Sequence, residues 1–317
     1  MTLVRLFGFA LFSLAATISG ASAQDYPKQT VRIVVPFGPG STTDLLARII
    51  GDKLAERWGQ PVIVENRPGV AGTASVARSA PDGYTLMLTS NGHTIIGALN
   101  KSLSFDPVKD FAGITKVATL PIVLVVPPAL PAKNLAELTA LAKQKPGGLS
   151  FSSAGVASAS YLAGELYKQS AKIEIVHVPY KSGTESLTST ARGDTQMNVN
   201  VLTPVLEFIK TDRVRAIAVA APKRSPAIAD VPTFAEAGLF DYDAWFGFMA
   251  PANTPAAILN KVSQDIAQVL GTPEIQTRME RQAIILGSST PAQMDATVKA
   301  DTERYSKVLQ AANIQRE

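Results

Sequence analysis

Residues 34–50 read VVPFGPGSTTDLLARII. The stretch passes from an apolar strand through a glycine- and proline-rich turn and three hydroxyl side chains into a helix with an apolar face. Glycine turns that open helices often bind anions, because free backbone N–H groups and the positive end of the helix dipole meet there. The lysine of a phosphate loop and the third glycine of a dinucleotide fingerprint are both absent. The turn therefore predicts a different kind of anion site.

A second turn repeats the design in residues 149–167, LSFSSAGVASASYLAGELY. Each turn offers backbone N–H groups, small hydroxyl donors and a helix start, without a fixed positive side chain. Such a pair suits a carboxylate held from two sides. The structural alternative is that a strand-to-helix turn prefers Gly, Ser, Thr and Asp for its own geometry. Asp44 in particular is most simply explained as a first-turn carboxylate that favours the helix dipole.

The rest of the chain alternates short apolar runs with amphipathic helical stretches, which predicts an α/β fold with largely parallel sheets. Residues 120–128, LPIVLVVPP, are apolar at nearly every position, as in a strand buried on both faces. Four Thr-Pro pairs predict helix starts with threonine at the N-cap and proline at the first helical position. These pairs are Thr203–Pro204, Thr254–Pro255, Thr272–Pro273 and Thr290–Pro291.

The N-terminus has the features of a secretory signal peptide. Arg5 precedes an apolar run from Leu6 to Ile18, and residues 21–23 read Ala-Ser-Ala, a small-x-small cleavage site. The apolar run is too short for a lasting transmembrane helix. We therefore expect residues 1–23 to be removed after Ala23, which leaves an exported, periplasmic chain long enough for about two domains.

Composition argues against several functions. The formal net charge of +4 is spread along the chain, which does not predict a nucleic-acid surface. The absence of cysteine excludes a thiol nucleophile, a lipid-anchored cysteine and zinc held by sulfur. The two histidines lie in no metal-ligand spacing, and no G-x-S-x-G nucleophile elbow occurs. We expect no metal, no cofactor and no enzymatic activity.

Several segments together resemble one family. They run in order from Tyr26 to about Ile314 and include YPKQTVRIVVPFGPGSTTDLLAR, LAERWGQPVIVENRPGVAG, APDGYTLMLTSNGHT, FDPVKDFAGIT, IVHVPYKSG, KRSPAIADVPTFAEAG and FGFMAPANTPAAI. The mature chain is similar to the substrate-binding proteins of tripartite tricarboxylate transporters, the Bug family of periplasmic receptors. The resemblance implies a type II periplasmic binding protein fold, in which two α/β domains joined by two crossing strands surround a ligand cleft.

The resemblance also implies a domain division and a function. Domain 1 would comprise residues 24–124 plus 247–317 and domain 2 residues 125–246, with LPIVLVVPP (120–128) and AWFGFMAP (244–251) as the crossing strands. The protein would be a monomer that captures a small carboxylate and delivers it to membrane subunits of a tripartite tricarboxylate-type transporter. An ABC-type receptor for amino acids or sulfonates and an exported α/β hydrolase are the alternatives.

Candidate ligand-binding residues come from the two turns and from other segments that follow strands. Ligands of open α/β sheets bind beyond the carboxyl ends of strands, where residues 90–93, Tyr180, Asn200 and Thr203 are expected. The candidates are Phe37, Gly38, Gly40, Ser41, Thr42, Asp44, Ser90, Asn91, His93, Ser153, Ala154, Gly155, Ser158, Ser160, Tyr180, Asn200 and Thr203. Relatives often carry polar residues or glycine where this chain has Val156, Ala157, Ala159 and Tyr161. The less polar second turn predicts fewer direct donors or a ligand with an apolar body.

Overall fold

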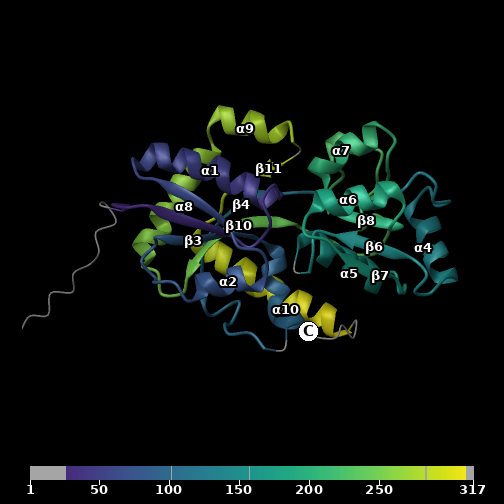
Figure 1. Cartoon of the computed structure of the whole chain (residues 1–317), viewed down its shortest axis with the longest axis horizontal. Helices are drawn as coiled ribbons and strands as arrows, with labels where there is room; N and C mark the ends of the chain where they lie inside the picture. The colour runs from purple at the N-terminus through teal and green to yellow at the C-terminus, as the bar shows by residue number, and fades with distance from the viewer. Residues whose placement is uncertain (1–25, 101, 157, 283, 312–317) are drawn as a thin grey trace, which may run out of the picture.

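The computed structural model describes residues 26–311 except 101, 157 and 283 (Figure 1). The predicted signal peptide and its cleavage site lie outside these residues. The described residues form two sheets, each with helices packed on it. Within them, no helix has both the length and the hydrophobicity needed to cross a membrane.

The first sheet has the strand order β11-β4-β10-β3-β1-β2. Its strands are β1 (Val31–Val35), β2 (Val62–Asn66), β3 (Thr85–Ser90), β4 (Phe111–Thr119), β10 (Trp245–Pro251) and β11 (Ile285–Leu286). The helices of this first domain are α1 (Thr42–Trp58), α2 (Val70–Ala77), the 3₁₀ helix η2 (Asn91–Ile95), α3 (Ile96–Leu99), α8 (Ala256–Leu270), α9 (Pro273–Glu280) and α10 (Pro291–Ala311).

The second sheet has the order β7-β6-β8-β5-β9. Its strands are β5 (Ile122–Val126), β6 (Ser150–Ser153), β7 (Val176–Pro179), β8 (Met197–Val201) and β9 (Arg215–Ala220). The helices of this second domain are α4 (Leu135–Gln144), α5 (Ala159–Ser170), α6 (Gly183–Arg192), α7 (Leu202–Lys210) and the 3₁₀ helix η3 (Pro226–Ile228).

The expectation of largely parallel sheets is wrong, because both sheets are mixed. β1 runs parallel to β2 and β3, and β6 runs parallel to β7 and β8. β10 is antiparallel to β3 and β4, and β5 is antiparallel to β8 and β9. The antiparallel pairs all involve strands next to the connections between the domains or the short C-terminal strand β11. Parallel pairing is confined to strands joined through helical crossovers.

Two connections join the domains, as expected. β4 ends in the first sheet at Thr119 and β5 begins in the second at Ile122, so that Leu120 and Pro121 form one connection. The other connection leads into β10, and the Leu120 N–H donates to the Ala244 carbonyl at 3.0 Å. The domain boundaries expected after residues 124 and 246 fall inside β5 and β10. We propose instead to divide the chain at the two connections.

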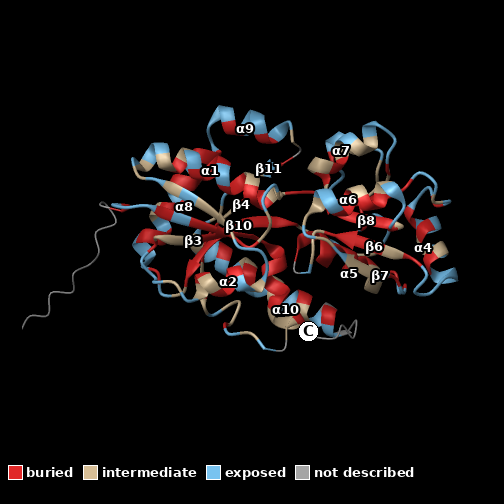
Figure 2. Cartoon of the chain, viewed as in Figure 1, coloured by how far each residue is buried: buried red, intermediate tan, exposed pale blue. Residues whose placement is uncertain are grey.

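The domains also share an apolar contact. The buried cluster around α5 and β6 includes Ile95 of η2, Leu99 of α3 and Tyr305 of α10. Figure 2 shows buried residues running along both sheets and through the region where they meet. The two domains are therefore joined by packed side chains as well as by the two connections.

The four Thr-Pro pairs do not all behave as expected. α9 has Thr272 as its N-cap, and Thr290 Oγ1 accepts from the Gln293 N–H at the start of α10. α7 instead has Val201 as its N-cap and α8 has Pro255. α7 begins early because the Leu202 N–H already has an acceptor, the Pro121 carbonyl of the connection, at 2.8 Å.

Candidate ligand-binding site

The first turn, residues 38–43, leads from β1 into α1 as the sequence predicts. Ser41 is the N-cap, and its Oγ accepts from the Asp44 N–H at 3.2 Å. The preceding Gly40 has φ of +78°, a conformation that favours glycine. The N–H groups of Thr42 and Thr43 have no hydrogen-bond acceptor among the described residues. Two unpaired N–H groups therefore lie at the positive end of the α1 dipole.

Asp44 maintains the shape of this turn. Its carboxylate accepts from the Gly40 N–H and from Asn66 Nδ2, each at 2.9 Å, and pairs with Arg48 at 2.9 Å. Burial alone would raise the pKa of the Asp44 carboxyl, but these hydrogen bonds and the Arg48 charge lower it below its ordinary value. Asp44 therefore acts within the protein, and the Gly40 N–H is not available to a ligand.

The second turn, residues 153–160, has the same form. Ser158 is the N-cap of α5 and accepts from the Tyr161 N–H at 3.1 Å. Ser160 Oγ accepts from the Ala154 N–H at 3.2 Å and lies 2.9 Å from Ser158 Oγ. The N–H groups of Ala159 and Ser160 have no acceptor in the part of the chain that the structure describes. The two turns thus present similar donors from opposite domains.

Two further helices of the second domain, α6 and α7, begin close to the two turns. Ser182 caps α6 through the Glu185 N–H at 3.2 Å, which leaves the N–H groups of Gly183 and Thr184 without an acceptor in the described chain. α7 begins beside them, and its Thr203 N–H is also without a described acceptor. Four helix N-termini, that of α1 from the first domain and those of α5, α6 and α7 from the second, therefore approach one space.

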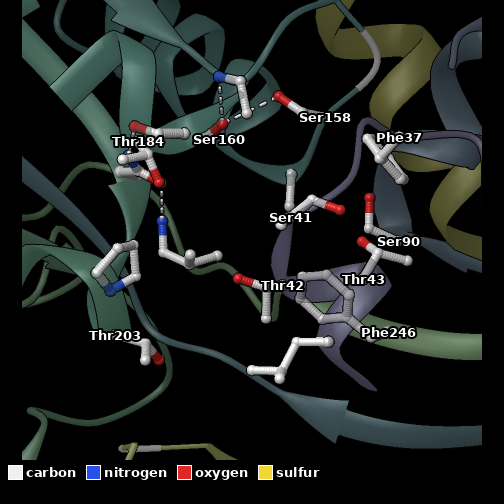
Figure 3. A pocket seen from close by; sticks show the side chains of 18 residues that line it. Phe37, Ser41, Thr42, Thr43, Ser90, Ser158, Ser160, Thr184, Thr203 and Phe246 are labelled. Carbon is white, nitrogen blue, oxygen red and sulfur yellow. Dashed lines mark hydrogen bonds between the residues drawn. The ribbon is translucent and has the colours of Figure 1, made fainter. Parts of the chain in front are cut away.

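That space is a cavity of about 180 Å³ between the domains. Its walls are Phe37, Gly40, Ser41, Thr42, Thr43, Leu45, Ser90, Ala154, Ser158, Ala159, Ser160, Gly183, Thr184, Asn200, Val201, Thr203, Pro204 and Phe246. None of these lining residues is charged. Figure 3 shows hydroxyl side chains of the first domain facing those of the second, with Phe37 and Phe246 on the first-domain side. Helix N-termini around uncharged walls favour an anion.

The cavity brings together ten of the candidate residues predicted from sequence. They are Phe37, Gly40, Ser41, Thr42, Ser90, Ala154, Ser158, Ser160, Asn200 and Thr203. Asn200 is partly engaged within the protein, because one Nδ2 proton is donated to the Gly183 carbonyl at 2.6 Å and its Oδ1 accepts from the Val201 N–H. Direct contact of these residues with a ligand stays a prediction.

Seven candidates lie outside the cavity walls, Asp44 among them. Gly38 faces the Lys181 carbonyl of the other domain, 3.5 Å from where a Cβ on Gly38 would lie. Gly155 faces the Tyr180 carbonyl, and the Tyr180 hydroxyl bonds Ser189 Oγ at 2.5 Å. Ser153 is fully buried, with its Oγ 2.8 Å from His177 Nε2. These residues contribute to the turns and their supports, outside the walls of the cavity.

Asn91 and His93 are also buried away from the cavity. His93 Nε2 lies 2.7 Å from the Pro107 carbonyl, and its ring packs on Phe111. Burial lowers the pKa of His93 to about 4, so its imidazole is neutral at physiological pH. Asn91 donates to the Tyr242 hydroxyl at 2.8 Å. Both side chains face the core because η2 turns them away from the end of β3.

Sequence reasoning missed eight cavity residues: Thr43, Leu45, Ala159, Gly183, Thr184, Val201, Pro204 and Phe246. Ser182 followed by glycine, threonine and Glu185 is a helix-start pattern that could have identified α6 as a third turn. No local pattern could have identified Phe246, because it comes to lie opposite Ser90 through the pairing of β10 with β3, which is far away in the sequence.

A substitution at Gly183 tests the close packing between the start of α6 and Asn200 of β8 at the cavity. A Cβ at this position would lie 2.5 Å from Asn200 Oδ1, and Asn200 is buried and hydrogen bonded on both sides. We expect Gly183→Ala to destabilise the protein by about 1–3 kcal/mol through overpacking. Denaturant unfolding measures this cost.

The Asn200→Ala variant is the control for this prediction. Because it makes room for the new methyl group, the double variant should be more stable than the sum of the two single effects predicts. Additive effects would show that Gly183 and Asn200 do not meet as described.

Fold and cavity define a two-domain solute receptor. The chain belongs to the tripartite tricarboxylate transporter family of receptors, whose model matches residues 46–314. Members of this family are periplasmic solute-binding receptors. Among the described residues, no group of three or more histidine or carboxylate side chains is placed to hold a metal ion.

Individual relatives are similar over nearly their whole length. Protein BugT of Bordetella pertussis is 31% identical, covering 98% of each chain. A protein of R. palustris solved with adipate has a TM-score of 0.84 and 31% identity, over 92% of this chain and 100% of its own. MatC of Rhodopseudomonas palustris, solved with bound malate, has a TM-score of 0.83 and 30% identity, over 90% of this chain and 100% of its own.

Proposed function

We propose that this chain is an exported periplasmic receptor that binds a small carboxylate between its two domains. It would act as a monomer and deliver the ligand to the membrane subunits of a tripartite tricarboxylate-type transporter. The observation that carries the proposal is the convergence of four helix N-termini, with unpaired N–H groups, on a cavity without charged walls. Adipate and malate in the two R. palustris structures are carboxylates, which supports this ligand class.

The walls also favour a particular distribution of polarity in the ligand. Donors from α1 and α5 lie on opposite sides of the cavity, so one carboxylate could accept from both domains at once. Phe37, Leu45 and Phe246 offer apolar surface beside them. A carboxylate on a compact, partly apolar body satisfies both kinds of wall.

An enzymatic role has little support. Ser153 and His177 are paired like a nucleophile and a base, but Ser153 is completely buried and its Oγ also accepts from the Gly155 N–H. Burial, and then the Lys168 charge, lower the pKa of His177 to about 4, which makes it a weak base. We infer that this pair supports the second turn and that the protein is not an enzyme.

A thermal-shift screen of the purified mature protein against small carboxylates tests the proposal. A true ligand at 100 times its dissociation constant should add about 2.7 kcal/mol to the free energy of unfolding. The matched control is the methyl ester of each ligand found, which keeps the shape and loses the charge. We expect the ester to lose most of the affinity, because oriented N–H groups and helix ends favour the anion. Equal binding of acid and ester would refute carboxylate recognition.

A further inference from the structure

Two hydrogen bonds cross between the domains at the walls of the cavity. Thr203 Oγ1, at the start of α7, donates to the Gln282 carbonyl just after α9 at 2.5 Å. On α5, the Ala159 carbonyl accepts from the Tyr242 hydroxyl at 2.7 Å. Thr203 and Ala159 line the cavity, whereas Gln282 and Tyr242 do not. Each bond therefore connects a cavity-lining residue of the second domain to a residue that does not line the cavity.

Tyr242 lies in the connection between the sheets, and hydrogen bonds and an ion pair hold this segment against the first domain. Its hydroxyl accepts from Asn91 Nδ2 of η2 at 2.8 Å. The neighbouring Asp243 pairs with Lys116 of β4 at 2.9 Å, and the Asp241 carbonyl accepts from Arg304 of α10 at 2.8 Å. The Tyr242–Ala159 bond is consequently a contact between the domains.

The two bonds lie on different sides of the molecule. α7 and α9 lie along one edge in Figure 1, and α10, beside which Tyr242 packs against Tyr305, lies along the opposite edge. The first turn meets the second domain as well, since Gly38 lies against the Lys181 carbonyl. The domains are thus closed over the cavity, with a hydrogen bond at each side.

We propose that the Thr203 and Tyr242 side chains are positioning groups that hold the two domains closed, and that neither hydroxyl contacts the ligand. The Thr203 hydroxyl donates its proton to the Gln282 carbonyl. The Tyr242 hydroxyl is buried, accepts from Asn91 and donates to the Ala159 carbonyl. If only the closed form binds tightly, the apparent Kd equals the intrinsic Kd divided by the closed fraction. Loss of either bond should therefore raise the Kd of every ligand by one common factor.

The closed fraction can be measured without any ligand. Because the chain has no cysteine, Asp52→Cys on α1 and Lys210→Cys on α7 would introduce a unique pair of exposed labelling sites, one on each domain. Distances between spin labels at these sites would be recorded for the otherwise wild-type chain and for the Thr203→Val and Tyr242→Phe variants. We expect both variants to shift the distribution towards longer, open distances, with a two- to tenfold loss in the closing equilibrium for each bond.

Matched controls separate closure from ordinary stability. Thr203→Ser keeps the hydroxyl and should restore the wild-type distances. Tyr167→Phe removes a buried hydroxyl whose partner, Thr139 at 3.0 Å, lies in the same domain. This variant should lower the melting temperature without changing the distances or the Kd.

The ligand part of the inference rests on the proposed function, but the distance measurement does not. With any carboxylate that binds the wild type, we expect the Kd to rise by the factor by which the closed fraction falls, equally across ligands. A variant whose distances match the wild type would remove its residue from the proposed role. A Kd change that differs among ligands at an unchanged closed fraction would show direct contact instead. Failure of the wild type to bind any carboxylate would count against the proposed function alone.

Discussion

Ser160→Asp is expected to weaken carboxylate binding by about 100- to 1000-fold relative to Ser160→Asn. Ser160 lies in the first turn of α5, is almost fully buried and lines the cavity. The two replacement side chains have nearly the same shape and differ in charge. A second carboxylate about 4 Å from the ligand's would cost roughly 4 kcal/mol at the effective dielectric constant of a protein surface, and 1.4 kcal/mol corresponds to tenfold. Titration calorimetry with a ligand from the screen measures the ratio.

Folding stability, measured by denaturant unfolding of both variants, provides the control. The helix dipole favours the aspartate by about 0.3–1 kcal/mol, whereas the burial of this position opposes its charge, so both variants are titrated under conditions in which they are fully folded. The loss of binding could then not be attributed to unfolding. Similar Kd values for the two variants would mean that the ligand's charge does not lie at the N-terminus of α5.

Asp44→Asn is expected to destabilise the protein by about 2–3 kcal/mol. A carboxylate that only faced a helix dipole would contribute about 0.3–1 kcal/mol. Asp44, however, accepts from Gly40 and Asn66 and pairs with Arg48, and an amide cannot accept at both of its terminal atoms. Asp52→Asn, at an exposed position of the same helix, is the matched control and should change stability by less than about 0.5 kcal/mol.

The same variant predicts a pH dependence of the difference in stability. The folded-state pKa of Asp44 lies below its ordinary value, so its contribution is fully present above the unfolded pKa of about 3.9. That contribution is lost as the pH falls through the folded-state pKa. Urea unfolding at a series of pH values should show the gap between wild type and Asp44→Asn closing below about pH 4. A gap that stays constant down to pH 2 would contradict the assigned hydrogen bonds.

Local chemistry made much of the site predictable. A strand followed by glycine and hydroxyl residues at a helix start specifies both turns, because the N-cap, the glycine conformation and the unpaired N–H groups are properties of a few consecutive residues. Ser41 and Ser158 accordingly cap α1 and α5. The unbroken apolar run in residues 120–128 likewise specified a fully buried strand, β5. The family resemblance added how the two turns face each other.

Features that depend on tertiary contacts could not be predicted in this way. β4 was missed because its sequence, FAGITKVAT, mixes small, charged and β-branched residues without a clear run. The orientation of Asn91 and His93 depends on partners far along the chain, Tyr242 and the Pro107 carbonyl. Thr203 was expected to cap a helix, but the Pro121 carbonyl starts α7 earlier and leaves its hydroxyl for Gln282.

The unpaired donors at the cavity belong mainly to the polypeptide backbone, at Thr42, Thr43, Ala159, Ser160, Gly183, Thr184 and Thr203. Every residue except proline supplies an N–H group, so a point mutation at such a position changes the side chain and keeps the donor. Sequence drift could therefore alter Phe37, Leu45, Val201 or Phe246, and with them the preferred ligand body, without erasing the capacity to hold an anion. In this receptor, the side chains that select the ligand body can change by mutation, whereas the backbone donors that bind the anion are kept as long as the fold is kept.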